Sequence, residues 1–94
     1  MIIGASEFRL RITGARSLKE KRKTLKSLKD RVSRMNISVA EVDDQDKWQA
    51  ATLAFAVVSN DTAYINSVLD KLSLYLMDYP EVELVDRQTE IIHI

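Results

Sequence analysis

Hydrophobic and polar residues alternate with two different periods along this chain of 94 residues. From Phe8 to Ile12 every second side chain is apolar and its neighbours are charged, which predicts a half-buried strand. From Leu18 to Met35 the apolar positions are three, four or seven residues apart, so they form one stripe along a helix. The pattern predicts further strands over residues 37–42, 50–59 and 82–92, with a second helix between the last two.

Capping residues and the single proline mark where these elements begin and end. Ser17 and Glu20 have the spacing of a capping box, which predicts that the first helix begins there. Asn60 or Asp61 is expected to cap the second helix, and Pro80 to end it. The stripe expected on the first helix comprises Leu18, Leu25, Leu28, Val32 and Met35, and that on the second comprises Ile65, Val68, Leu69, Leu72, Leu76 and Tyr79.

The order of these elements predicts an α+β fold of the ferredoxin-like βαββαβ kind. In this arrangement a four-stranded antiparallel sheet carries both helices on one face. A chain of this length is expected to form one domain over residues 1–94. The first helix then begins at the same end of the sheet as the tip of the hairpin around residues 43–46.

Composition narrows the class of protein. The chain has no cysteine, which excludes disulfides, cysteine-bound zinc and thiol nucleophiles. The N-terminus lacks the basic and apolar stretches of a signal peptide, and the longest apolar run, residues 50–58, is about half of a membrane span. We therefore expect a cytoplasmic protein with no membrane partner.

The formal net charge is zero, but the charges are segregated along the chain. Residues 1–34 contain 11 of the 14 Lys and Arg residues and only three acids, whereas residues 35–94 contain 11 acids. Association with a partner depends on such local charge rather than on the total. The segregation therefore points to an anionic partner.

Much of the positive charge falls on one side of the first helix. Cations three and four residues apart repel each other by about 0.2–0.5 kcal/mol per pair, and cations at a helix N-terminus oppose its dipole. Phosphates of a partner would relieve both costs, in binding that is salt-sensitive and independent of base sequence. We interpret the cluster as a nucleic-acid-binding surface, with ribosomal RNA or a ribosomal subunit as the expected partner; its residues are Lys19, Arg22, Lys23, Lys26 and Lys29, assisted by Arg16.

Acidic residues at the same end of the domain offer a second explanation. Acids of the hairpin and of the end of the second helix are predicted to lie near the start of the first helix, where they would neutralise it in a surface network of little energetic value. They are Glu41, Asp43, Asp44 and Asp46 of the hairpin, and Asp78 and Glu81 after the second helix. Both explanations stay open at this point. The aspartates do not follow the calcium-loop pattern, which requires Gly and Glu at positions 48 and 54, so no metal site is predicted.

The third predicted strand is apolar on both faces, which favours self-association. Two helices cover only one face of the sheet, so the other face would expose small apolar side chains. A homodimer formed through this open face is the second functional hypothesis, and a small-anion or amino-acid sensor is the third. The predicted interface residues are Leu53, Ala54, Phe55, Ala56, Val57 and Val58.

No residues are arranged for catalysis. His93 has no Ser, Cys or acid placed to act with it, and no nucleophile–base pair can be recognised, so neither an enzymatic activity nor a cofactor is predicted. Trp48 is expected to cover one end of the core, because an exposed Trp is costly in a loop.

Several short motifs along nearly the whole chain carry a family resemblance. They are Arg16-Ser17-Leu18-Lys19-Glu20-Lys21-Arg22, Val39-Ala40-Glu41-Val42, Gln45-Asp46, Trp48-Gln49, Val58-Ser59 and Arg87-Gln88-Thr89-Glu90. Together they resemble the YlxP-like family of small bacterial proteins, whereas the tail, residues 91–94, is less typical. The resemblance implies a ferredoxin-like domain in the bacterial cytoplasm, of unknown function and with no catalytic residues to carry over. Genes of this family often lie among those for transcription elongation, translation initiation and ribosome maturation, which favours an RNA or ribosome partner by association.

Overall fold

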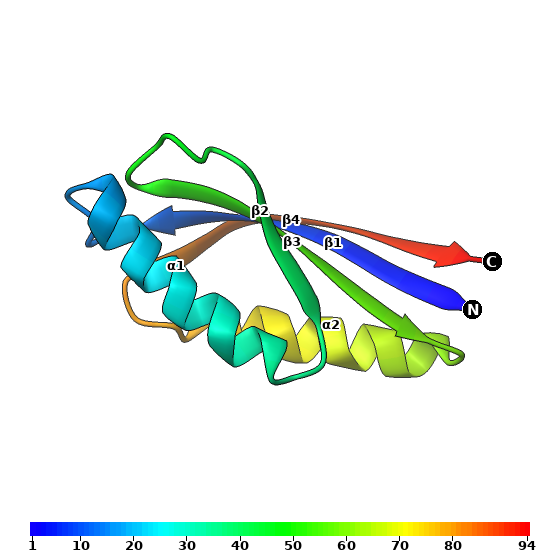
Figure 1. The fold of residues 1–94 in the computed structure, drawn as a ribbon. Helices are drawn as coiled ribbons and strands as arrows, with labels where there is room; N and C mark the ends of the chain where they lie inside the picture. The colour runs from blue at the N-terminus through cyan, green and yellow to red at the C-terminus, as the bar shows by residue number, and fades with distance from the viewer.

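The computed structural model describes all residues from Met1 to Ile94 and confirms the predicted ferredoxin-like arrangement. Four antiparallel strands form one sheet in the order β2-β3-β1-β4, and both helices lie on one face of it (Figure 1). No helix has the length and apolar character needed to cross a membrane. The elements are β1 (Ile2–Ile12), α1 (Leu18–Ser33), β2 (Ser38–Asp43), β3 (Ala50–Ser59), α2 (Thr62–Met77) and β4 (Val82–His93).

The first strand begins six residues earlier than its alternating pattern predicted. β1 runs through Ile2 and pairs along its length with both β3 and β4, so it is a central strand. Its first half is apolar or small on both faces, which hides the period of two. Gly4 is one of these small residues, because α2 lies so close to it that no side chain fits there.

Side chains cap both helices at their N-termini. The Ser17 hydroxyl accepts a hydrogen bond from the backbone N–H of Glu20 at 3.2 Å, as the capping box predicted. The Glu20 carboxylate accepts its bond from the N–H of Arg16, one residue before the cap. Of the two candidates for α2, Asp61 is the cap, and its carboxylate accepts from the N–H groups of Ala63 and Tyr64.

The core fills the space between the helices and the helix-facing side of the sheet. Phe8 and Phe55 meet edge to face at its centre, with their ring centroids 5.1 Å apart. Most of the two predicted helical stripes are buried there, but Met35 is exposed and was assigned wrongly, because α1 ends at Ser33. The buried helical residues are Lys21, Leu25, Leu28 and Val32 of α1 and Ile65, Leu69, Leu72 and Leu76 of α2.

The two faces of β3 have different environments, which corrects part of the predicted dimer interface. Leu53, Phe55 and Val57 point toward the helices and are buried, so they are not available to a partner. Ala54, Ala56 and Val58 lie on the open face, where the first two are half-buried and Val58 is exposed. Any contact through this face would therefore use the second set only.

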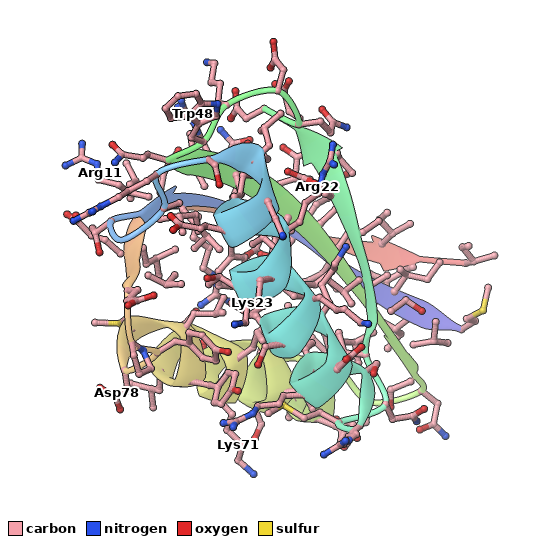
Figure 2. The ribbon with its side chains drawn as sticks, turned by 60° about the vertical axis from the view of Figure 1, so that its left-hand side comes forward. Arg11, Arg22, Lys23, Trp48, Lys71 and Asp78 are labelled. Carbon is pink, nitrogen blue, oxygen red and sulfur yellow. The ribbon has the colours of Figure 1, made fainter.

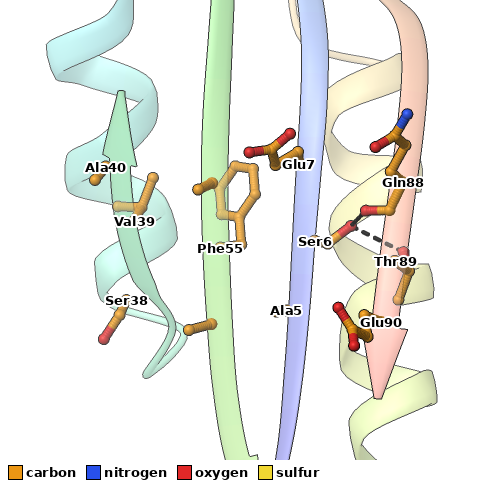
Figure 3. Close-up of a pocket in the computed structure, with 12 residues that line it drawn as sticks. Ala5, Ser6, Glu7, Ser38, Val39, Ala40, Phe55, Gln88, Thr89 and Glu90 are labelled. Atoms are coloured by element: carbon orange, nitrogen blue, oxygen red, sulfur yellow. Dashed lines mark hydrogen bonds between the residues drawn. The ribbon is translucent and has the colours of Figure 1, made fainter. Parts of the chain in front are cut away.

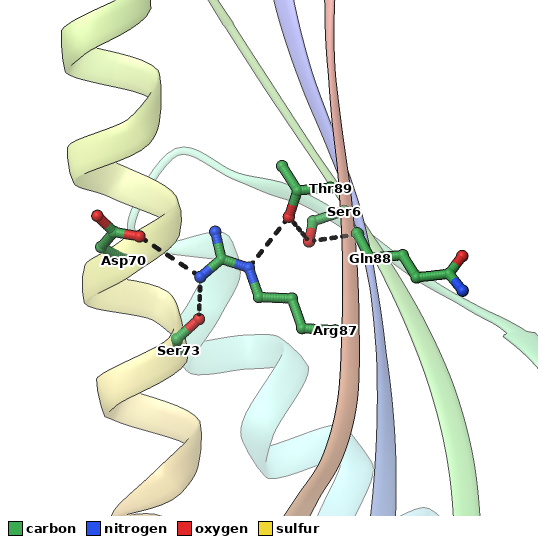
Figure 4. Close-up of polar contacts among 6 residues, drawn as sticks. All are labelled: Ser6, Asp70, Ser73, Arg87, Gln88 and Thr89. Carbon is green, nitrogen blue, oxygen red and sulfur yellow. Dashed lines mark hydrogen bonds and ion pairs between the residues drawn. The ribbon is translucent and has the colours of Figure 1, made fainter.

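Arg87 joins the last strand to the second helix (Figure 4). Its guanidinium donates to the Ser73 hydroxyl at 2.6 Å and to the Asp70 carboxylate at 3.4 Å, both on α2. It also donates to the Thr89 hydroxyl at 3.0 Å and lies 5.4 Å from the centre of the Phe8 ring. Arg87 is thus occupied in holding α2 against the sheet.

The close approach of α2 to β1 predicts that Gly4→Ala destabilises the protein. A Cβ at this position would lie 2.3 Å from Ile65 Cγ2 and 3.3 Å from Leu69 Cδ1, and both side chains are fully buried. Such overpacking lowers the free energy of unfolding by about 1–3 kcal/mol, measurable by urea denaturation.

Gly14→Ala is the matched control. Its Cβ would meet the carboxylate of the exposed Glu81 at 3.0 Å, and that side chain can move aside, so we expect a change below about 1 kcal/mol. A double variant with Ile65→Ala should lose less stability than the sum of the single changes. A Gly4→Ala variant as stable as the wild type would contradict the packing described.

Candidate nucleic-acid interface

Four of the predicted nucleic-acid-binding residues form one stripe along α1, away from the core. Lys19, Arg22, Lys26 and Lys29 are spaced by three, four and three residues and lie beside the buried row of the helix. Lys29 is half-buried and the other three are exposed, and Arg22 is seen on the surface of α1 in Figure 2. Arg16 precedes the helix cap and is also exposed. The structure therefore brings four of the cations to one side of α1, with Arg16 directly before its N-cap.

Lys23 faces a different surface from this stripe. It lines a cleft of about 580 Å³ between α1 and the turn that follows α2. Arg31, which the sequence did not single out, lines the same cleft, as do the carboxylates of Glu20 and Glu81. The cleft thus combines two cations with two anions, and it forms an edge of the basic surface rather than its centre.

Lys21 differs from every other cation of α1 because it is turned into the core. Only 1% of its surface is exposed. Its ammonium lies 3.0 Å from the Glu41 carboxylate on β2 and donates to the backbone carbonyl of Asp44 at 2.6 Å. The position is four residues before Leu25, in register with the buried row, and this spacing is the signal by which it could have been recognised.

Lys21 is the only cation of α1 that forms an ion pair with an acid of the hairpin. None of the six predicted binding residues forms an ion pair in the structure. Two of the hairpin acids are paired: Glu41 with Lys21, and Asp44 with Lys47 at 3.0 Å. Asp43 accepts a hydrogen bond from the Asp44 N–H, and Asp46 forms no ion pair. The second explanation of the basic helix therefore accounts for one lysine, and the outer stripe forms no ion pair with the hairpin.

Asp44 organises the loop between β2 and β3. Its carboxylate accepts hydrogen bonds from Lys47 and from the buried Thr52 hydroxyl, and these bonds hold the pKa of the Asp44 carboxyl below its ordinary value. The bond to Asp44 likewise raises the pKa of Lys47. No group of three or more histidine or acidic side chains is gathered here or elsewhere in a form that could hold a metal ion.

Trp48 does not cover the core, which corrects the expectation from the sequence. The residue is 55% exposed at the tip of the β2–β3 loop, on the same corner of the molecule as Arg11 (Figure 2). Gln49, its neighbour, is also exposed, and its side chain donates to the Ala15 carbonyl at 3.1 Å. The aromatic ring is therefore presented to solvent, in a loop whose next residue contacts the segment before α1.

The open face of the sheet contains a broad groove of about 620 Å³ (Figure 3). Its floor consists of small side chains on three strands, which are Ala5, Ala40, Ala54 and Ala56. Glu7, Gln88 and Glu90 stand over it from β1 and β4. This surface is apolar at its base and acidic at its rim.

Comparison with known proteins gives two matches. Residues 3–89 match the model of a family described as "Protein of unknown function (DUF503)". The chain is 34% identical over 90 residues to the uncharacterized protein YlxP of Bacillus subtilis (strain 168), an alignment that covers 95% of this chain and 98% of YlxP. Both descriptions leave the activity open.

The burial of Lys21 predicts that Lys21→Met strongly destabilises the protein. The substitution keeps the length of the side chain but leaves the half-buried Glu41 carboxylate and the Asp44 carbonyl without their partner. Breaking a buried pair in this way costs about 3–5 kcal/mol, and we expect the lower end because Glu41 retains some contact with water.

Lys26→Met is the control for this prediction, because Lys26 is exposed on the same helix and makes no ion pair. We expect it to change the free energy of unfolding by less than about 0.5 kcal/mol in urea denaturation. The double variant Lys21→Met, Glu41→Leu removes both charges and should be more stable than Lys21→Met alone. Equal stability of Lys21→Met and Lys26→Met would show that the ion pair does not hold α1 to β2.

Proposed function

Because this chain belongs to the family described as protein of unknown function (DUF503), we propose its role from its surface: it binds RNA through the outer stripe of α1, without catalysing a reaction. The family membership confirms the resemblance that its motifs indicated. The observation that carries the proposal is the lack of any ion pair to Lys19, Arg22, Lys26 and Lys29, although acidic residues lie on the neighbouring hairpin. An RNA exposed in a ribosomal subunit is the partner that we propose.

The distribution of charge favours α1 over the sheet as the RNA-binding surface. RNA readers of related architecture stack bases on aromatic residues of the sheet. Here the open face offers alanines at its centre, and Glu7 and Glu90 would repel phosphates. The outer stripe of α1 has the opposite charge, and repulsion among its cations falls when phosphates bind between them.

Binding of this kind predicts a steep dependence on salt. With about five phosphate contacts, the logarithm of the binding constant should fall with a slope of about −3.5 against the logarithm of salt for a single strand. Raising salt from 50 to 200 mM should then weaken binding about 100-fold. In the double variant Lys19→Glu, Lys26→Glu the slope should become shallower by about 1.4.

A matched pair of single variants separates the stripe from the total charge. Lys26→Glu and Lys71→Glu change the net charge equally, and both residues are exposed, but Lys71 lies on α2. Titration of ribosomal subunits and ribosomal RNA across a salt series should show a loss of affinity for Lys26→Glu only. Equal losses in the two variants, or an unchanged slope in the double variant, would contradict the assignment to α1.

A second candidate function, self-association through the open face, is supported by the groove. Its alanine floor lets another surface approach the sheet backbone closely, and exposed apolar residues extend the patch toward the termini. These are Met1, Val58, Ile92 and Ile94. We propose a second copy of this chain as the partner.

Sedimentation at increasing protein concentration tests this second candidate. We expect a dimer for the wild type and a monomer for Ala56→Arg, because an Arg in the floor of the groove would hold the two sheets apart. Ala63→Arg, the same substitution at an exposed position of α2, should remain dimeric. A wild-type protein that stays monomeric at the highest concentration would exclude this interface.

A further inference from the structure

We propose that Trp48 is a stacking platform for an unpaired base of the RNA, which makes single-stranded RNA the substrate class; this inference rests on the proposed function of α1. Trp48 is the only tryptophan of the chain and the most exposed of its aromatic side chains. Stacking on an aromatic ring accepts any base, because every base presents a π face. The ring would therefore add contacts to bases where α1 contacts phosphates.

The loop that carries Trp48 is fixed on both sides of the ring. Lys47 is held by the Asp44 carboxylate at 3.0 Å, and its backbone N–H donates to the Asp44 carbonyl at 3.1 Å. On the other side, the Gln49 carbonyl accepts from the N–H of Ile12 at 2.9 Å, and its side chain donates to the Ala15 carbonyl. A base that stacks on Trp48 would thus meet a loop that is already ordered, which lowers the entropic cost of binding.

Lys21 and Thr52 anchor the beginning of the same loop from opposite sides. The Lys21 ammonium donates to the Asp44 carbonyl from α1, and the Thr52 hydroxyl donates to the Asp44 carboxylate from β3. Asp44 is therefore engaged in shaping the loop. Trp48 itself is left with no side-chain partner and more than half of its surface in water.

Two cations belong to segments that contact the residues following Trp48. Arg11 pairs in the sheet with Ala50, two residues after Trp48, and its salt bridge to Glu83 is long, at 3.7 Å, with both side chains more than half exposed. Such a pair is weak, so Arg11 can exchange Glu83 for a phosphate. On the helix side, Arg16 follows Ala15, the residue that Gln49 contacts. A strand that passes from α1 across the loop would meet Arg16, the Trp48 ring and Arg11 in turn.

The single tryptophan allows a direct test in the unmodified protein. We would titrate it with oligouridylate and with an abasic oligomer of the same length and charge, following the emission of Trp48. We expect saturable quenching by oligouridylate only, and an affinity about 5- to 150-fold higher than for the abasic oligomer, from the stacking of one base. Both oligomers should share the steep salt dependence.

Variants at this position provide the second readout, with binding followed by the anisotropy of a labelled oligomer. Trp48→Ala should lower the affinity for oligouridylate to that for the abasic oligomer, with an unchanged salt slope, and Trp48→Phe should retain most of the difference. Lys26→Glu should weaken both oligomers equally. Because the ring is exposed, we expect the thermal unfolding temperature of Trp48→Ala to match that of the wild type.

The outcomes separate this inference from the proposed function. Equal affinity for both oligomers without quenching, together with a loss on Lys26→Glu, would overturn the role of Trp48 and leave RNA binding by α1 intact. No binding of either oligomer at low salt would overturn both. Quenching by oligouridylate that persists in Lys26→Glu at full affinity would support the stacking role and remove α1 from the site.

Discussion

The ammonium group of Lys21 is the constraint on which the basic end of the molecule depends. It lies in the core-facing row of α1, where a charge without partners would be very costly. The Glu41 carboxylate and the Asp44 carbonyl satisfy it, and in doing so they tie the first turns of α1 to β2 and to the start of the next loop. The orientation of the helix follows, because a helix with Lys21 inward must carry Lys19 and Arg22 on its outer side.

The ion pair between Lys21 and Glu41 also determines which acids of the hairpin remain unpaired. Glu41 forms an ion pair with Lys21. Asp44 forms an ion pair with Lys47 and accepts a hydrogen bond from the Thr52 hydroxyl. These two acids therefore stabilise the loop and do not pair with the outer stripe of α1. One helix thus carries a buried cation that is paired and surface cations that are not, and an anionic partner fits the second group.

The fold could be predicted from the sequence because its signals are local. The alternation from Phe8 to Ile12, the stripe of α1 and the Ser17 cap each follow from spacing alone, and all three are found in the structure. The burial of Lys21 was harder to predict, because lysine is ordinarily a surface residue. Its spacing from the buried Leu25 and Leu28, four and seven residues later, is the signal that places it in the core-facing row.

The failures among the site residues concern contacts between distant segments. Trp48 was expected to cover the end of the core, but it is exposed, and its neighbour Gln49 makes the contact to Ala15, 34 residues away in the sequence. The sequence does not show which face of β3 meets the helices. Pairing with β1 places Leu53, Phe55 and Val57 on the helical face and leaves Ala54, Ala56 and Val58 on the open face. No local pattern contains that information, because both faces of the strand are apolar.

The two candidate surfaces lie on opposite sides of the sheet, and this arrangement makes them compatible. α1 covers the helical face, while the groove and the apolar patch near Val58 occupy the open face, at the end of β3 away from Trp48. A dimer formed there would leave both copies of α1 facing outward. Two linked RNA-binding surfaces raise the effective concentration of the second contact once the first has formed, provided that one RNA can reach both. Self-association would then strengthen RNA binding without any change at Lys19, Arg22 or Trp48.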